Sequence, residues 1–139
     1  MKIGHIENGI VLDHITAGNG MNIYNVLNLG KLDCTVALIK NADSPKMGKK
    51  DIIKISTHLD IDLDVLGYLD PGITVNVIRD GKVSERRHLA LPERVVGVIK
   101  CKNPRCITSV ENVTHEFKLT DPVKKTYRCI YCEHEAKKK

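Results

Sequence analysis

The chain has 139 residues, of which 42% are hydrophobic, and a formal net charge of +5. This length allows one ordinary domain or two small ones, and a domain of about 45 residues usually needs a metal or disulfides to fold. With one Phe and no Trp, the hydrophobic core must be aliphatic. No stretch approaches the roughly 20 apolar residues of a membrane span, and the N-terminus lacks a signal-peptide pattern, so we expect a cytoplasmic protein.

The first forty-eight residues predict a strand, a helix and a second strand. Residues 9–15 are rich in β-branched side chains, which favour a strand, and residues 34–39 repeat this pattern. Between them, residues 19–29 carry apolar side chains near helical spacing, with Gly30 as the expected C-cap. The polar residues 41–48 are expected to form a loop.

The segment 49–58 predicts a second helix. Its isoleucines lie beside Lys50 and Lys54, and residues four apart share one helix face. The two ammonium groups are therefore expected on the same side of the element.

A third helix and a hairpin follow. Residues 62–69 predict a short helix, and residues 74–78 a strand that returns over residues 83–87 after an Asp-Gly turn. With the helical stretches 49–58 and 62–69 counted as one helical region, the order is β-α-β-α-β-β, which predicts an α+β fold with the helices on one face of a mainly antiparallel sheet. We expect a ferredoxin-like α/β sandwich.

Charge changes sign near residue 93. Residues 1–93 hold eleven Lys and Arg against twelve Asp and Glu, whereas residues 94–139 hold eleven against five. Pro92 interrupts the strand pattern at the same place. We therefore expect two domains, residues 1–92 and 93–139, the second a small all-β domain. Its basic charge attracts nucleic acid or an acidic protein, and charge alone does not choose between them.

The second segment contains four of the five cysteines, as Cys101-x4-Cys106 and Cys129-x2-Cys132. Short turns between paired cysteines aim two sulfurs at one point, and four thiolates form the closed tetrahedral shell of a structural zinc site. Because the segment has few large apolar side chains, one Zn²⁺ ion should supply most of its folding free energy.

Other readings of these residues remain open. The cysteines could be unrelated buried thiols, or Cys129 and Cys132 a redox pair. Nearby His115 and His134 could compete as metal ligands. Cys34 lies in an apolar run and is expected to be a buried structural thiol.

Six short motifs occur in one order along nearly the whole chain. They are Asp13-His14-Ile15 within residues 9–15, Met-Gly-Lys-Lys-Asp-Ile-Ile-Lys-Ile at 47–55, Thr-Val-Asn-Val-Ile at 74–78, Leu-Pro-Glu-Arg at 91–94, Cys-Lys-Asn-Pro-Arg-Cys-Ile-Thr at 101–108, and Tyr-Arg-Cys-Ile-Tyr-Cys-Glu at 127–133. In these motifs and their order the sequence resembles the regulatory chain of aspartate carbamoyltransferase.

This resemblance implies a non-catalytic subunit. Chains of that family have an N-terminal nucleotide-binding allosteric domain and a C-terminal zinc domain that docks on the catalytic chain. Regulatory dimers link catalytic trimers into a dodecamer, and ATP, CTP and UTP act as effectors that control pyrimidine biosynthesis. Mg²⁺ can accompany the bound nucleotide. Neither nucleic acid nor a membrane is an expected partner.

The resemblance also implies roles for residues that match the family's motifs. Asp13 and Lys54 would hydrogen-bond the ribose hydroxyls, and His14, Lys50 and Arg86 would face the phosphates. The remaining nucleotide-binding positions are Ile6, Ile78 and the backbone near Val83, which would enclose the base, and Asn76, which would line a second, metal-assisted nucleotide position.

Two positions depart from the family pattern. Arg86 stands where better-studied members have Lys, and Arg87 is its alternative in the same hairpin. His5 occupies a base-contacting position that is commonly a small residue. Asn103 and Glu111 are candidate contacts with the catalytic chain.

Two rival functions come from other classes. A zinc-ribbon nucleic-acid-binding protein would use the basic second half, although this half has no evident stacking platform. A redox or metal-transfer protein would use Cys129 and Cys132.

Overall fold

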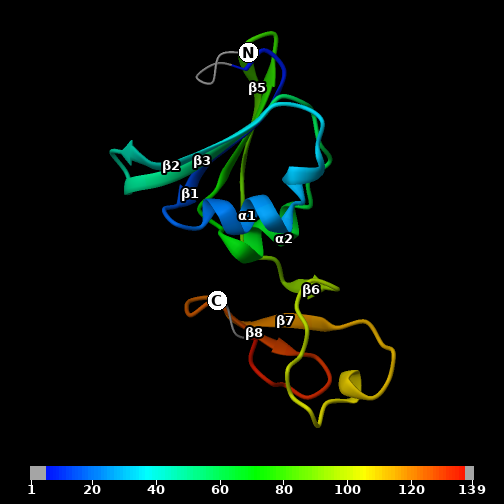
Figure 1. Ribbon diagram of the computed structural model, residues 1–139. Coiled ribbons are helices and arrows are strands. Elements are labelled where there is room, and N and C mark those ends of the chain that lie inside the picture. Colours follow the sequence, from blue (N-terminus) through cyan, green and yellow to red (C-terminus); the bar gives the residue numbers. More distant parts are fainter. Residues whose placement is uncertain (1–5, 137–139) are drawn as a thin grey trace. The chain divides into compact units, whose positions relative to one another are not determined.

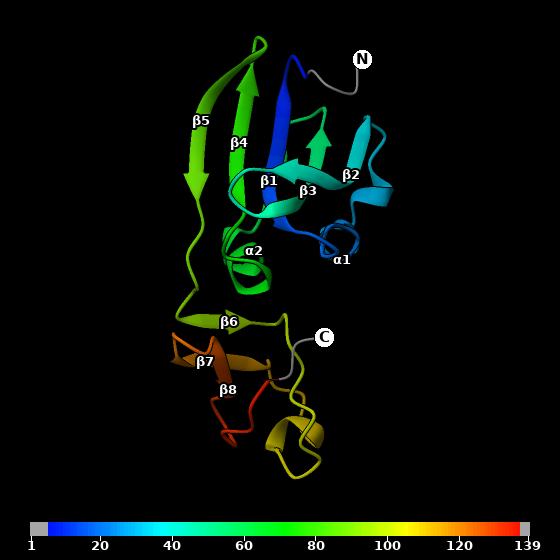
Figure 2. The same ribbon diagram turned by 90° about the vertical axis from the view of Figure 1, so that its left-hand side faces the viewer.

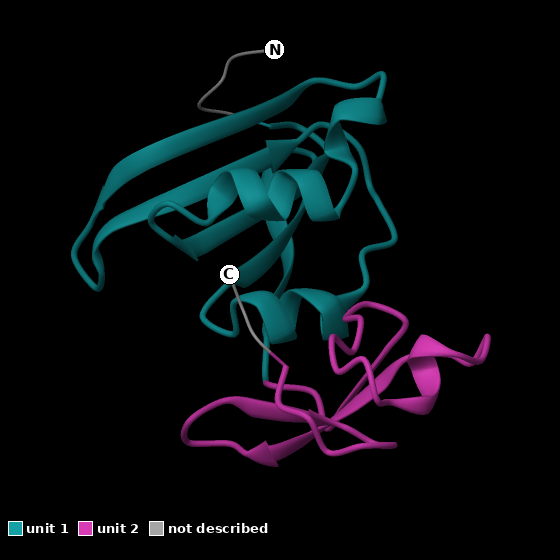
Figure 3. Cartoon of the chain, turned by 60° about the horizontal axis from the view of Figure 1, so that its bottom comes forward, with its two compact units in different colours: residues 1–90 teal, residues 91–139 magenta. Residues whose placement is uncertain are grey.

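The computed structural model describes residues 6–136. The chain divides into two compact units, unit 1 (residues 1–90) and unit 2 (residues 91–139), which are coloured separately in Figure 3. Among the described residues, no helix is long and apolar enough to cross a membrane.

Unit 1 contains a five-stranded sheet in which every neighbouring pair of strands is antiparallel. In chain order its elements are β1 (Gly9–Thr16), α1 (Gly20–Val26), a 3-10 turn η1 (Leu29–Lys31), β2 (Val36–Ser44), β3 (Gly48–Ile55), α2 (Leu63–Leu69), β4 (Thr74–Arg79) and β5 (Lys82–His88). Figure 1 labels the two helices and the strands other than β4, which is labelled in Figure 2. The strands lie side by side in the order β2-β3-β1-β4-β5 (Figure 2). Elements β1 to β4 give the ferredoxin-like β-α-β-β-α-β topology, and β5 extends it by a hairpin.

The core of unit 1 lies between the helices and one face of this sheet. Leu12, Ile53 and Val75 occupy one cross-strand row and join the same buried cluster as Ile23 of α1 and Leu66 of α2. The cluster contains only Ile, Leu and Val, so the expected aliphatic core of this unit is confirmed. The helix residues of this cluster all lie on that one face. We call the opposite face of the sheet the open face.

The helix predicted over residues 49–58 is wrong, because this segment forms β3. Asp51, Ile53 and Ile55 are buried and alternate with half-buried residues, which is the period of a strand with one face on the core. Lys50 and Lys54 nevertheless share a face, since an even spacing also places strand side chains on one side. The element order is therefore β-α-β-β-α-β-β.

The predicted loop at residues 41–48 is also largely wrong. β2 continues through Ser44 and pairs with the start of β3, so only residues 45–47 form the turn. An edge strand tolerates this polar sequence because its outer side faces solvent. The first helix is shorter than expected and its C-cap is Leu27, not Gly30.

Other local predictions are confirmed. α2 begins where Asp62 caps it, accepting hydrogen bonds from the amides of Asp64 and Val65. The β4–β5 turn has positive φ at Asp80 (53°) and Gly81 (76°), as expected of an Asp-Gly hairpin.

Unit 2 is a three-stranded antiparallel sheet with a single 3-10 turn among its described residues. Its elements are β6 (Arg94–Val96), η2 (Ile107–Ser109), β7 (Glu116–Asp121) and β8 (Thr126–Cys129), with strand order β6-β7-β8. Val95, Phe117 and Cys129 face one another across the strands and are buried. The all-β expectation for this segment is confirmed.

Candidate metal centre and ligand-binding face

The four cysteines of unit 2 converge on one point. All four sulfurs lie within 4.8 Å of one another, with 3.5 Å between Cys101 and Cys132 and 3.7 Å between Cys106 and Cys129. A disulfide needs about 2.05 Å, whereas sulfurs at tetrahedral corners about 2.3 Å from one ion are about 3.8 Å apart. The geometry therefore fits a single metal ion held by four thiolates, and it excludes the reading as unrelated cysteines.

Both turns between the paired cysteines direct backbone amides at sulfur. Burial raises the pKa of the Cys101 and Cys129 thiols, and backbone amides oppose this rise: the amide of Asn103 at Cys101, and the amides of Tyr131 and Cys132 at Cys129. These amides stabilise negative charge on the sulfurs. Each of the two turns thus places at least one backbone amide beside a sulfur of the cluster.

His115 has a supporting role that the sequence did not reveal. Its Nδ1 accepts a hydrogen bond of 2.9 Å from the amide of Cys101, so this nitrogen orients a ligand residue. Among the described residues, the group that could hold a metal ion consists of the four cysteines and contains neither His115 nor His134.

Thr108 is a second residue without a sequence signal. Burial raises the pKa of the Cys101 thiol to about 12, whereas the hydroxyl and amide of Thr108 lower the pKa of Cys106 to about 7. Yet the Thr108 hydroxyl is buried and lacks a well-formed hydrogen bond to any described residue. A thiolate accepts more strongly than a thiol, so this hydroxyl would gain a full partner once Cys106 binds metal.

A cross-strand row with three polar side chains crosses the open face of unit 1. Lys54 of β3, Val11 of β1, Asn76 of β4 and Arg86 of β5 lie directly opposite one another in the sheet register. Arg86 Nε donates a 3.0 Å hydrogen bond to Asn76 Oδ1. Three of the predicted nucleotide-binding side chains are therefore brought together from strands distant in sequence.

The register separates Arg86 from its alternative, Arg87. Arg87 lies opposite Val75, which belongs to the core cluster on the helix side, and it forms an ion pair of 2.7 Å with Glu85. Arg86 is thus the arginine that shares the open face with Lys54.

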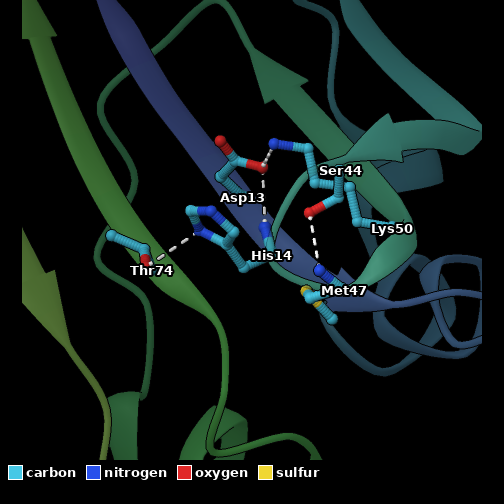
Figure 4. A network of polar contacts seen from close by, with 6 residues as sticks. All are labelled: Asp13, His14, Ser44, Met47, Lys50 and Thr74. Carbon is cyan, nitrogen blue, oxygen red and sulfur yellow. Dashed lines mark hydrogen bonds and ion pairs between the residues drawn. The ribbon is translucent and has the colours of Figure 1, made fainter.

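A bulge at the end of β1 contains Asp13 and His14, and Lys50 of β3 lies beside it. The register shifts between Leu12 and Ile15, and His14 adopts a left-handed φ of 59°. Asp13 forms a 2.9 Å ion pair with Lys50, and His14 Nδ1 lies 3.2 Å from the Thr74 hydroxyl (Figure 4).

The electrostatics of this bulge favour an ionised carboxylate. Burial alone would raise the pKa of Asp13, but hydrogen bonds from the Lys50 ammonium and the His14 amide outweigh it and lower the pKa below its ordinary value. Ser44 closes the adjacent β2–β3 turn by accepting from the Met47 amide (Figure 4).

The predicted apolar positions differ in exposure. Ile6 and Ile78 are buried, whereas Val83 is 48% exposed at the start of β5. His5 lies outside the described residues.

Fold and cysteine cluster together define a class of protein. An antiparallel α+β unit is followed by a small all-β unit with a four-cysteine metal centre. This combination is the one predicted by the resemblance to aspartate carbamoyltransferase regulatory chains.

Comparisons with known proteins identify the family within this class. Residues 1–90 match the allosteric domain, and residues 93–139 the metal binding domain, of the aspartate carbamoyltransferase regulatory chain. The chain is 54% identical over 134 residues to that regulatory chain from Clostridium acetobutylicum (96% of this chain, 92% of the relative). It is 52% identical over 135 residues to the one from Clostridium tetani (96% and 94%), and 46% over 138 residues to the one from Bifidobacterium longum (99% and 99%). The chain belongs to the family of aspartate carbamoyltransferase regulatory chains.

The resemblance drawn from the six motifs is confirmed by these matches. They do not favour the nucleic-acid-binding alternative.

Proposed function

We propose that this chain is the non-catalytic regulatory subunit of an aspartate carbamoyltransferase. Nucleoside triphosphates bind to the open face of its N-terminal domain (residues 1–92), and its C-terminal domain (residues 93–139) docks on the catalytic chain. The observation that carries the proposal is the cross-strand row containing Lys54, Asn76 and Arg86, which lies in the segment that matches an allosteric domain.

The metal is proposed to be one structural Zn²⁺. Four thiolates at tetrahedral spacing suit zinc and leave no open position for substrate, which separates the site from catalytic zinc centres. The ligands are Cys101, Cys106, Cys129 and Cys132. A reducing compartment such as the cytoplasm would keep these thiols available for the ion.

The charges of the open face and the β1 bulge fit a nucleoside triphosphate. A triphosphate needs cations that converge, and Lys50, Lys54 and Arg86 project from β3 and β5. The ionised Asp13 carboxylate can only accept hydrogen bonds, which suits ribose hydroxyls. Nucleotide binding would then draw Lys50 away from Asp13 towards the phosphates, with His14 beside them.

The remaining residues complete the proposed site. The buried Ile6 and Ile78, with the backbone near Val83, would enclose the base. Asn76 would line a second nucleotide position, to which Mg²⁺ contributes.

Regulation follows from linkage between the two sites. ATP, CTP or UTP can shift the activity of the catalytic chains only by binding more tightly to one quaternary state of the dodecamer than to another. Couplings of this kind are typically about 1–3 kcal/mol.

Isothermal titration with ATP, CTP and UTP tests the nucleotide site. We expect saturable binding that weakens about tenfold in Arg86→Ala, because a charge-assisted hydrogen bond to phosphate is lost. Arg87→Ala is the matched control, since this neighbouring cation faces the other side of the hairpin and should bind as the wild type does. Absence of binding by all three nucleotides would refute the proposed site.

Gel filtration with the cognate catalytic chain tests the proposed partner. We expect one large complex with enzyme activity that responds to nucleotides. A chain that ignores the catalytic subunit and instead shifts RNA or DNA at physiological salt would support the rival zinc-ribbon function.

A further inference from the structure

Three cations form a row across the sheet of unit 2. The register places Arg94 of β6 opposite Lys118 of β7, and Lys118 opposite Arg128 of β8. Adjacent strands are about 4.8 Å apart, so the three side chains leave the backbone within about 10 Å of one another. They face away from the buried row formed by Val95, Phe117 and Cys129, because successive side chains of a strand alternate between faces.

The row is only partly neutralised. Arg94 pairs with Glu116, whose carboxylate lies diagonally across the two strands. The Arg128 guanidinium donates a 3.1 Å hydrogen bond to the backbone carbonyl of Glu133, and Arg128 also lies opposite Glu135 in an isolated antiparallel bridge. The Lys118 ammonium has no hydrogen bond or ion pair with another described residue. Like charges directly opposite one another destabilise a sheet, so the row favours an added anion.

A pocket lies over this row. Its volume is about 150 Å³, and it is lined by Arg94, Lys118, Thr120, Arg128, Cys129, Ile130 and Glu133. Sites for whole small molecules are larger, at about 300–1,000 Å³. The pocket therefore has room for one charged group and too little for a nucleotide. Cys129 lines the pocket and also belongs to the four-cysteine cluster, so a metal bound there would fix the position of β8 and of Arg128.

We propose that this pocket binds one carboxylate side chain, an Asp or Glu of the catalytic chain, and so forms a charge-specific contact of the docking surface. The proposal rests on the proposed function, which supplies the partner. A carboxylate matches the planar fork of Arg128 and neutralises the unpaired Lys118. An extended nucleic acid fits less well, because no aromatic side chain lines the pocket for base stacking.

Affinity measurements between the full-length regulatory chain and the cognate catalytic subunit test the pocket. We expect Lys118→Ala to weaken binding about tenfold at low salt, and Lys118→Glu to weaken it further through repulsion. Lys124→Glu is the matched control, because this exposed cation on the β7–β8 turn lies outside the pocket and should leave binding unchanged. Metal content and circular dichroism of each variant show that the fold is intact, which is expected because Lys118 has no described partner to lose.

The outcomes separate this inference from the function on which it rests. If the wild-type chain does not bind the catalytic subunit, the proposed function fails and the inference fails with it. If the wild type binds and Lys118→Glu binds equally well, only the inference fails. If Lys118→Glu keeps the catalytic subunit but loses inorganic phosphate or RNA that the wild type binds, the pocket serves another anion and the inference is overturned.

Discussion

The two units of this chain are stabilised in different ways. Unit 1 buries a continuous cluster of Ile, Leu and Val between a sheet and two helices, so burial of apolar surface holds it together. In unit 2 few apolar side chains are buried, the largest being Phe117 and Tyr127, and the cluster of four cysteines lies beside them. A short segment with few apolar side chains can thus fold and still present a basic surface, provided that an ion fixes its turns.

Metal removal is expected to have the largest effect, because it should unfold one unit and not the other. A chelator, or Cys129→Ala, should unfold unit 2 and leave unit 1 folded, because structural Zn²⁺ contributes about 10–16 kcal/mol in small zinc domains. Amide NMR spectra with and without metal measure the effect. Cys34→Ala, which changes the cysteine outside the cluster, should retain the metal. Persistence of the dispersed unit 2 signals in metal-free protein would contradict the comparison.

The second largest effect is expected at Asp51, the buried carboxylate of unit 1. It is 0% exposed and accepts hydrogen bonds from the amides of Gly18 and Gly20 at 3.0 and 2.9 Å and of Asn41 at 3.0 Å. Asp51→Ala should destabilise unit 1 by about 3 kcal/mol, since several buried amides lose their acceptor. Urea unfolding followed by a probe in unit 1 gives the value.

The control for this prediction is Asp43→Ala. Asp43 pairs with Lys49, but its side chain is 92% exposed, so its loss should change stability by less than about 0.5 kcal/mol. If both substitutions lowered the free energy of unfolding equally, the hydrogen bonds of the buried Asp51 carboxylate would not contribute to the stability of unit 1. The glycine at position 20 agrees with this role of Asp51, because a Cβ added there would lie only 2.8 Å from Asp51 Oδ2.

Thr108 allows a finer test of the metal-held unit. Thr108→Val should lower metal affinity about tenfold, because Cys106 loses a hydroxyl donor beside the ion. Thr108→Ser keeps the donor and should bind nearly as well as the wild type. Competition with a chromophoric chelator compares the three proteins, and equal affinities for Val and wild type would rule out the hydroxyl contact.

The smallest effect concerns Asp13 and pH. Its pKa is lowered in the folded protein, so its contribution to stability is present above the ordinary pKa of about 4 and is lost as pH falls through the lowered value. We expect a contribution of about 1 kcal/mol at most, because the Asp13 side chain is 22% exposed and its ion pair is partly screened. Urea unfolding at pH 6 and pH 3 should therefore show a steeper loss for the wild type than for Asp13→Asn.

Lys50→Met sharpens this prediction. Without the ammonium, the effect of burial should outweigh that of the His14 amide, and the pKa of Asp13 should rise. NMR titration of the carboxyl carbon measures this change. A pKa that stays low in this variant would show that the His14 amide, rather than Lys50, holds the charge.

Local signals in the sequence determined the elements whose chemistry is local. The spacing of the cysteine pairs, the Asp80-Gly81 turn and the Asp62 cap each depend on residues a few positions apart, and each is found in the structure. The aliphatic composition likewise determined the kind of core that unit 1 contains.

Tertiary structure decided what depends on distant strands. Residues 49–58 suit a helix or a strand by spacing alone, and only pairing with β1 and β2 selects β3. Pairing of β4 with β5 placed Arg86 beside Asn76 and turned Arg87 to the other face, and pairing of β7 with β6 and β8 aligned Arg94, Lys118 and Arg128. The contact of His115 with the Cys101 amide also joins separate segments. A sequence pattern indicates which side chains face the core. It does not determine which residues of two strands lie opposite each other, because that register is set by hydrogen bonds that form only when the strands pair in the folded protein.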